Sequence, residues 1–163
     1  MFNDLSTFFS VWEQESDNTA KILAALTDAS LQQAVVPGGR TLGRLANHII
    51  ETLTEMPYKL GLDIAEEQPS FTTAIELQQH FQRCNEQFVN AVKRQWSNDS
   101  LKQTTDMYGE AWQNGFSLWV LLTHMIHHRA QMTVLMRQAG LPVPGLYGPS
   151  KEEWAAMGMQ PMP

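Results

Sequence analysis

The chain has 163 residues, with 11 basic and 17 acidic side chains and a formal net charge of −6. A surface with this excess of acids repels phosphate backbones, which argues against a general nucleic-acid-binding protein. The hydrophobic share of 43% suffices for a buried core and excludes disorder of the whole chain. A single cysteine excludes an internal disulfide and a zinc site built from cysteines. We expect one domain over residues 1–163, with a frayed tail at roughly 158–163.

The N-terminal sequence MFNDLSTFFS lacks the basic segment and the small-residue cleavage site of a secretory signal. The most apolar stretch, residues 116–126, is too short to cross a bilayer and runs into histidines. The sequence therefore predicts a cytoplasmic protein without a membrane partner.

Apolar residues recur at steps of three and four in four long stretches, which is the spacing of amphipathic helices. The first stretch covers residues 5–26, and the sequence AVVPGG at 34–39 breaks the helical pattern. The second begins near Thr41, where Pro57 is expected to kink or end the helix and Gly61 to stop it.

The third helix is predicted over residues 72–96, and residues 97–115 form the longest non-helical piece, with a short extended segment near Thr104. The fourth helix is predicted over 116–139, and the spacing of SKEE at 150–153 predicts a last short helix. No segment shows the sustained alternation of a strand. We therefore expect an all-α protein, a four-helix bundle with a short C-terminal helix.

Histidines mark the candidate site. His124 and His128 lie one turn apart on one face of the fourth helix, at the spacing that lets two imidazoles bind one metal ion. The same face carries Leu121 and Leu135, so the rings face the core and need partners. A metal ion and hydrogen bonds to neighbouring helices both satisfy that need. The sequence HMIHH lacks the glutamate of HExxH, so a zinc-protease mechanism is not supported.

His48 lies in the second helix, at the edge of an apolar stripe. Two facing helices of a bundle can bring it together with the pair on the fourth helix, which gives three neutral nitrogen donors and leaves a position open for water or substrate. The alternative is a half-exposed packing residue.

These residues resemble a known family. LANHIIE in the second helix, HMIHHRAQ in the fourth and the following MRQAGLPVPGLYG are similar to the DinB/YfiT-like group of metal-dependent enzymes. The resemblance implies a bundle in up-down-down-up order, a homodimer, and a zinc or nickel ion held by His48, His124 and His128. Arg129 and Gln131 match the residues that follow the last ligand and are not expected to be ligands.

Two further residues are candidates for catalysis. Glu51, one turn after His48, can orient that ring or act as a base, or it can be an ordinary exposed helix carboxylate. His127 is an additional histidine beside the family's ligand position, and it points about 100° away from His128.

The resemblance group includes transferases that use a low-molecular-weight thiol such as bacillithiol, mycothiol or glutathione. An open position on a zinc-like ion favours ionisation of a thiol, so the chain needs no nucleophile of its own. The leading hypothesis is thus a thiol S-transferase acting on a small-molecule substrate. The alternatives are a non-catalytic metal- or ligand-binding stress-response protein and a metal-dependent hydrolase.

Overall fold

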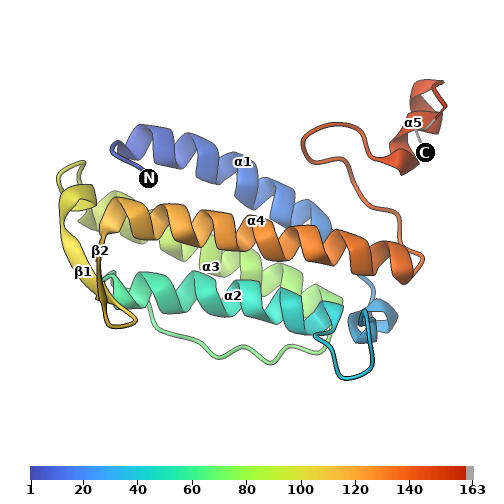
Figure 1. Cartoon of the computed structure of the whole chain (residues 1–163), viewed down its shortest axis with the longest axis horizontal. Helices are drawn as coiled ribbons and strands as arrows, with labels where there is room; N and C mark the ends of the chain where they lie inside the picture. The colour runs from blue at the N-terminus through green and yellow to red at the C-terminus, as the bar shows by residue number, and fades with distance from the viewer. Residues whose placement is uncertain (161–163) are drawn as a thin grey trace.

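In the computed structural model, which describes residues 1–160, four long helices lie side by side (Figure 1). They are α1 (Leu5–Ala24), α2 (Leu42–Lys59), α3 (Ala74–Gln95) and α4 (Asn114–Gln138). α2 packs against α3 and α4, and α1 packs against the same two helices. Short 3-10 helices lie in two of the connections, η1 (Asp28–Gln32) and η2 (Ser100–Lys102), and a third, η3 (Ala155–Met157), lies in the C-terminal segment. The prediction of a mainly helical protein is confirmed.

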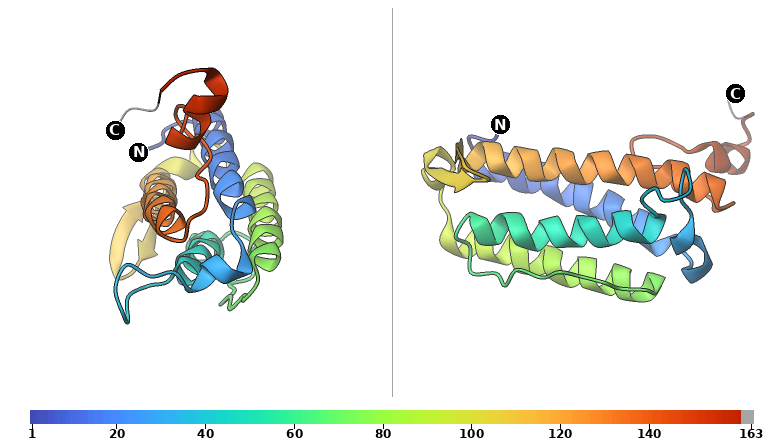
Figure 2. Two further views of the ribbon diagram at one scale, coloured as in Figure 1. Left: turned by 90° about the vertical axis from the view of Figure 1, so that its right-hand side faces the viewer. Right: turned by 60° about the horizontal axis from the view of Figure 1, so that its bottom comes forward.

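The connection between α2 and α3, residues 60–73, runs back along the bundle (Figures 1 and 2). Side chains of α2 hold it in place: the amide of Asn47 exchanges two hydrogen bonds with the backbone of Phe71, and Thr54 Oγ1 accepts from the N–H of Glu67. α3 therefore begins at the end of the bundle where α2 began. A long crossover of this kind is what an up-down-down-up order requires.

Capping residues explain where the helices begin. Asp4, Thr41 and Thr73 stand directly before α1, α2 and α3, and each side chain accepts a hydrogen bond from a backbone N–H of the first turn. These bonds satisfy donors that have no partner within the helix. Gly140, at φ 75°, follows the end of α4 in a left-handed conformation that glycine adopts without strain.

The expectation for Pro57 is corrected in part. Pro57 lies in the last turn of α2, and the helix continues for two residues to Lys59. Proline removes a single backbone N–H, and so close to the end of a helix this loss does not break a long hydrogen-bonded run. Gly61, at φ 76°, follows the helix, as the sequence predicts.

The all-α prediction is wrong at one place. Strands β1 (Thr104–Met107) and β2 (Glu110–Gln113) form an antiparallel hairpin between α3 and α4. Tyr108 and Gly109 form its turn with φ values of 61° and 88°, the left-handed pair that suits a two-residue hairpin loop. Strands of four residues are too short to show a clear alternation, which is why the pattern predicted only an extended segment.

The predicted last helix is present as α5 (Lys151–Trp154). Of the tail expected to fray, residues 161–163 lie outside the described residues, and the N–H of Met159 donates to the carbonyl of Trp154. Nowhere in residues 1–160 is a helix both long enough and apolar enough to span a bilayer.

Candidate metal centre

Three predicted site residues meet where α2 packs against α4. His48 comes from α2, and His124 and His128 come from α4; one ring nitrogen of each lies within 4.8 Å of the other two. The Nε2 atoms of His124 and His128 are 3.1 Å apart. Two nitrogens bound at about 2.1 Å to a tetrahedral ion lie about 3.4 Å apart, so this spacing suits two ligands of one ion. The structure thus brings the three histidines together, as the sequence predicts.

Two of the three rings are oriented through their other nitrogen. His48 Nδ1 lies 3.1 Å from a carboxylate oxygen of Glu51, and His128 Nδ1 lies 2.8 Å from Oε1 of Gln131. With the proton on Nδ1, each ring donates to its partner and keeps an unprotonated Nε2. Both partners follow their histidine by three residues on the same helix, a spacing at which side chains meet. Metal-binding histidines are commonly oriented in this way.

His124 has no such partner. Its Nδ1 is buried and makes no hydrogen bond to any described residue. Burial, followed by the charges of His128, His48, His127 and Arg40, lowers the pKa of His124 to about 4. Burial likewise lowers the pKa of His128. Both rings are therefore neutral near pH 7 and offer lone pairs, which is the form in which histidine binds a metal.

Glu51 is not an isolated surface carboxylate. It contacts His48, and both terminal nitrogens of Arg44 donate to it at 3.1 Å. The hydrogen bond from His48 and the charge and hydrogen bonds of Arg44 hold the pKa of Glu51 below its usual value. An ionised Glu51 accepts a hydrogen bond from His48 and holds the orientation of that ring. Its contacts make Glu51 a positioning residue.

His127 lies outside the cluster. Its side chain is exposed, and its Nε2 lies 3.1 Å from the side-chain nitrogen of Gln131. The amide of Gln131 therefore contacts His127 at one end and His128 at the other. Sequence reasoning assigned Gln131 no role, although its spacing of three residues from His128 was a readable signal.

Arg129, which follows His128, points into the bundle and is 1% exposed. Its guanidinium pairs with the Glu15 carboxylate of α1, donates to Thr19 Oγ1 and contacts the hydroxyl of Tyr147. Tyr147 in turn donates to Glu15 at 2.7 Å. Arg129 is therefore a structural residue that joins α4 to α1 and to the C-terminal segment.

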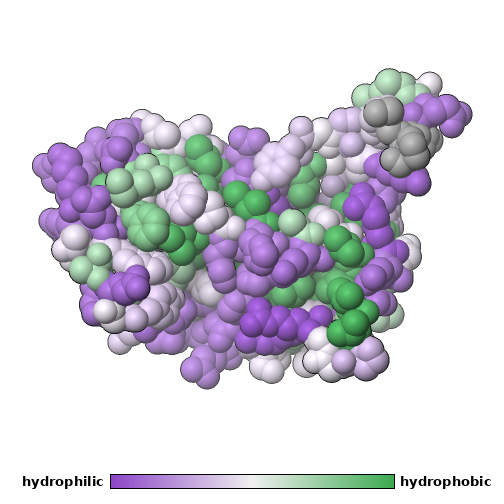
Figure 3. All heavy atoms as spheres, viewed as in Figure 1, coloured by the Kyte–Doolittle hydropathy of each residue, from purple (hydrophilic) through white to green (hydrophobic). Residues whose placement is uncertain are grey.

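A pocket of about 510 Å³ opens beside His128, between α4 and the loop 33–41. The loop is closed by a bridge between Ala34 and Thr41. The pocket lining is mainly apolar: Val35, Gly39, Arg40, Leu45, His127, His128, Gln131, Val134 and Leu135. Figure 3 shows apolar surface gathered at the lower right, where this loop meets α4.

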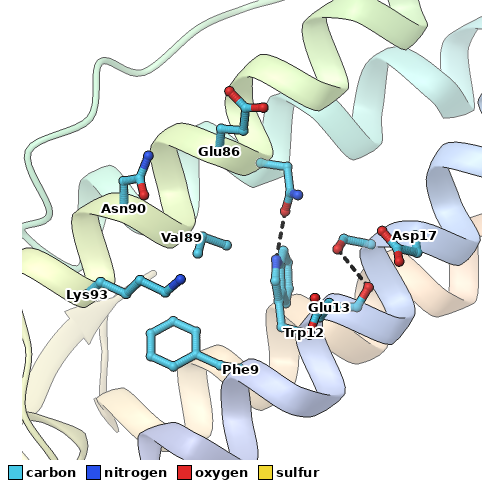
Figure 4. Close-up of a pocket in the computed structure, with 10 residues that line it drawn as sticks. Phe9, Trp12, Glu13, Asp17, Glu86, Val89, Asn90 and Lys93 are labelled. Carbon is cyan, nitrogen blue, oxygen red and sulfur yellow. Dashed lines mark hydrogen bonds between the residues drawn. The ribbon is translucent and has the colours of Figure 1, made fainter.

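A second pocket, of about 320 Å³, lies between α1 and α3 (Figure 4). Phe9, Trp12 and Val89 form its apolar part, and Lys93 lies 5.4 Å from the ring centre of Phe9. Its other lining residues are acids, amides and a serine, namely Glu13, Ser16, Asp17, Asn85, Glu86 and Asn90. Among the described residues no histidine or cysteine lines it, so this pocket is separate from the histidine cluster between α2 and α4.

Comparisons with known proteins identify the relatives of this chain. The DinB family matches residues 1–162. The uncharacterized protein YrdA of Bacillus subtilis (strain 168) is 42% identical over 166 residues, covering 98% of each chain.

Two crystal structures share the fold. A DinB-like protein from Bacillus cereus ATCC 10987 is 39% identical, with a TM-score of 0.87 over 90% of this chain and 100% of that one. A DinB-like protein from Bacillus subtilis, YjoA, is 16% identical with a TM-score of 0.68 over 83% of this chain and 96% of that one, a likeness of fold alone. Through its sequence match over nearly its whole length, this chain belongs to the DinB family.

Proposed function

We propose that the protein is a divalent-metal-dependent enzyme whose ion, zinc or nickel, is held by His48, His124 and His128. The observation that carries the proposal is the convergence of three ring nitrogens within 4.8 Å, beside a pocket of about 510 Å³. Three neutral protein ligands with an adjacent open space are typical of catalytic rather than structural metal sites. Nε2 of His124 faces Nε2 of His128 at 3.1 Å, so both rings offer the same nitrogen to one ion.

We further propose that the reaction is thiol S-transfer. A bound ion of this class lowers the pKa of a thiol or a water molecule. In this reaction the thiol would lose its proton to water, its sulfur would form a bond to an electrophilic carbon of the second substrate, and the bond from that carbon to the leaving group would break, with the leaving group taking the electron pair.

Cys84 supports a thiol that comes from outside the protein. It is the sole cysteine of the chain and is 1% exposed, and burial raises its pKa to about 11. A thiol of this kind is protonated near neutral pH and out of reach of a substrate. We therefore assign the nucleophilic thiol of the proposed reaction to a cosubstrate such as bacillithiol, mycothiol or glutathione.

In this proposal the chain's own residues bind the substrates and orient the metal ligands. His48 and His128 are held by Glu51 and Gln131, and the apolar pocket lining excludes water from one side of the cluster. Glu51 acts through His48, and His127 lies at the exposed edge of the pocket.

Cobalt-substituted protein tests the proposal, because sulfur coordination adds a charge-transfer absorption band. We expect bacillithiol, mycothiol or glutathione to produce this band and to be conjugated to an activated aryl chloride, with both signals absent in His48→Ala. If none of the three thiols changes the spectrum or reacts, the transferase proposal fails. Ester hydrolysis by the same protein would then identify the hydrolase, and metal binding without either activity would identify the binding protein.

A further inference from the structure

The pocket beside His128 has one charged lining residue, Arg40, besides two histidines and one amide. The rest of the lining is apolar or glycine, and none of the carboxylates of residues 1–160 lines the pocket. Its volume of about 510 Å³ lies in the range of small-molecule sites, which is about 300–1,000 Å³. The pocket therefore combines an apolar wall with a single positive group.

Arg40 differs from its neighbour Arg44 in its contacts. Arg44 is paired with Glu51, whereas none of the ion pairs formed among residues 1–160 includes Arg40. Its side chain is exposed at the end of the loop that closes the pocket. An unpaired guanidinium has five donors in a planar fork that matches a carboxylate.

Apolar side chains with unusual exposure surround this group. Val35 on the loop is 63% exposed and Val134 on α4 is 52% exposed, and both line the pocket. Leu45 and Leu135 complete the apolar wall. A ligand with a hydrocarbon body would cover the two valines and remove their surface from water.

We propose that this pocket binds the organic substrate through an apolar body and a carboxylate, with Val35 and Val134 contacting the body and Arg40 binding the carboxylate. The proposal depends on the proposed function only for the reacting centre that lies next to the pocket. It makes Arg40 a specificity-determining residue, because an apolar wall alone does not distinguish an acid from its amide.

The test uses hexanoate and hexanamide, which have the same length and differ in charge. Methyl NMR spectra of the valines and leucines are recorded during titration of the full chain, once with zinc and once after treatment with EDTA. We expect shifts at the methyl groups of Val35 and Val134, and an affinity for hexanoate about fivefold higher than for hexanamide at low salt. Arg40→Gln should abolish this preference, and Arg40→Lys should retain most of it. Arg137→Gln, an exposed arginine of α4 that pairs with Glu152, is the matched control and should leave the preference unchanged.

Three outcomes would overturn the proposal. Equal affinities for hexanoate and hexanamide would remove the anion site. A preference that survives Arg40→Gln but disappears with EDTA or in His48→Ala would mean that the carboxylate binds the ion. Shifts at Val35 and Val134 that depend on protein concentration without any probe would mean that a second copy of the chain covers the pocket. Because the EDTA-treated protein reports on the pocket alone, a failure of the metal-site proposal is seen separately, as a loss of zinc binding with the preference intact.

Discussion

The packing side of the bundle, between α1 and α3, differs in its polar groups from the histidine side, between α2 and α4. On the packing side the bundle is closed by aromatic rings, and Trp12 lies 4.9 Å from Phe88 edge to face and donates its indole N–H to Asn85. On the histidine side, three imidazoles occupy positions that a packing helix would fill with apolar side chains. Buried nitrogens without a partner among the described residues occur at Asn18 on α1 and at His124 on α4, but only that of His124 belongs to a cluster of converging rings. Positions where a chain gives up apolar packing and leaves a buried polar group without a hydrogen bond are typical of functional sites.

The largest expected effect is the loss of bound metal from the histidine side. Single changes His48→Ala, His124→Ala or His128→Ala should reduce bound metal from about one ion per chain to almost none, because two imidazoles alone make a poor site. Elemental analysis of protein purified without a polyhistidine tag measures the occupancy. His127→Ala is the matched control and should keep its ion. Full occupancy in the His48→Ala protein would remove α2 from the site.

The next effect concerns the buried ion pair between Glu15 of α1 and Arg129 of α4. Glu15→Gln leaves the buried guanidinium of Arg129 without its counter-charge and should lower the free energy of unfolding by about 3 kcal/mol. Urea denaturation measures the change. The double change Glu15→Leu with Arg129→Met should recover much of the loss, while Arg137→Met at the exposed pair with Glu152 should cost less than about 1 kcal/mol. Equal effects at the two pairs would contradict the importance of burial.

The pH dependence of stability sharpens the comparison. In metal-free protein the pKa of His124 is about 4, so between the ordinary histidine value and pH 4 the unfolded chain binds a proton that the folded chain does not. The free energy of unfolding should therefore fall as the pH drops from about 6.5 to about 4, by about 2 kcal/mol once the partial exposure of the ring is allowed for. Denaturant titrations across this range measure it, and His124→Gln should flatten the curve. An unchanged curve in that variant would assign the effect to other groups.

A smaller effect comes from the residues that orient the rings. Glu51→Ala or Gln131→Ala removes the acceptor on Nδ1 of His48 or His128 and should weaken metal binding about tenfold. Competition with a chromogenic chelator measures the affinity. Glu55→Ala, one turn further along α2, is the control, since Glu55 contacts Tyr108 and Lys59 rather than a histidine. If Glu51→Ala and Gln131→Ala bind metal as tightly as Glu55→Ala does, the contacts on Nδ1 do not contribute to metal affinity.

The smallest effect lies on the packing side. Asn85→Ala removes the acceptor of the Trp12 indole and should lower the free energy of unfolding by about 1 kcal/mol without any loss of metal. Thermal unfolding and elemental analysis of the same preparation give both quantities. A variant that lost its metal would show that the two sides are coupled.

The sequence predicted the helices well because the apolar pattern that marks a helix extends over many residues. Periodic apolar residues over some twenty positions set the ends of α3 to within two residues. The hairpin was missed because its strands are short and its turn uses Tyr108 and Gly109 in place of a common asparagine–glycine pair. Helix patterns are cumulative, whereas a hairpin of this size depends on two residues in left-handed conformations.

The three histidines of the candidate site could be predicted from the sequence, whereas most of the contacts around them could not. The spacing of His124 and His128, with the family resemblance, placed the three rings together. Glu51 was named as a candidate partner of His48 beside the alternative of an exposed helix carboxylate, and Gln131 was given no role, since both are common helix residues. Arg40 lies on a loop whose path no sequence pattern specifies. The homodimer, the small-molecule substrate, the identity of the metal and the cytoplasmic location stay predictions.

The burial of Arg129 has a mechanical consequence for its neighbour. His128 and Arg129 are adjacent on α4, so turning the helix about its axis would move both side chains at once. Pairing of Arg129 with Glu15 and contact with Tyr147 fix that angle from the far side of the helix. The direction in which His124 and His128 face His48 of α2 is consequently fixed by the fold itself, before any ligand arrives. A ligand that binds there meets a preorganised geometry and spends little of its binding energy on rearranging the bundle.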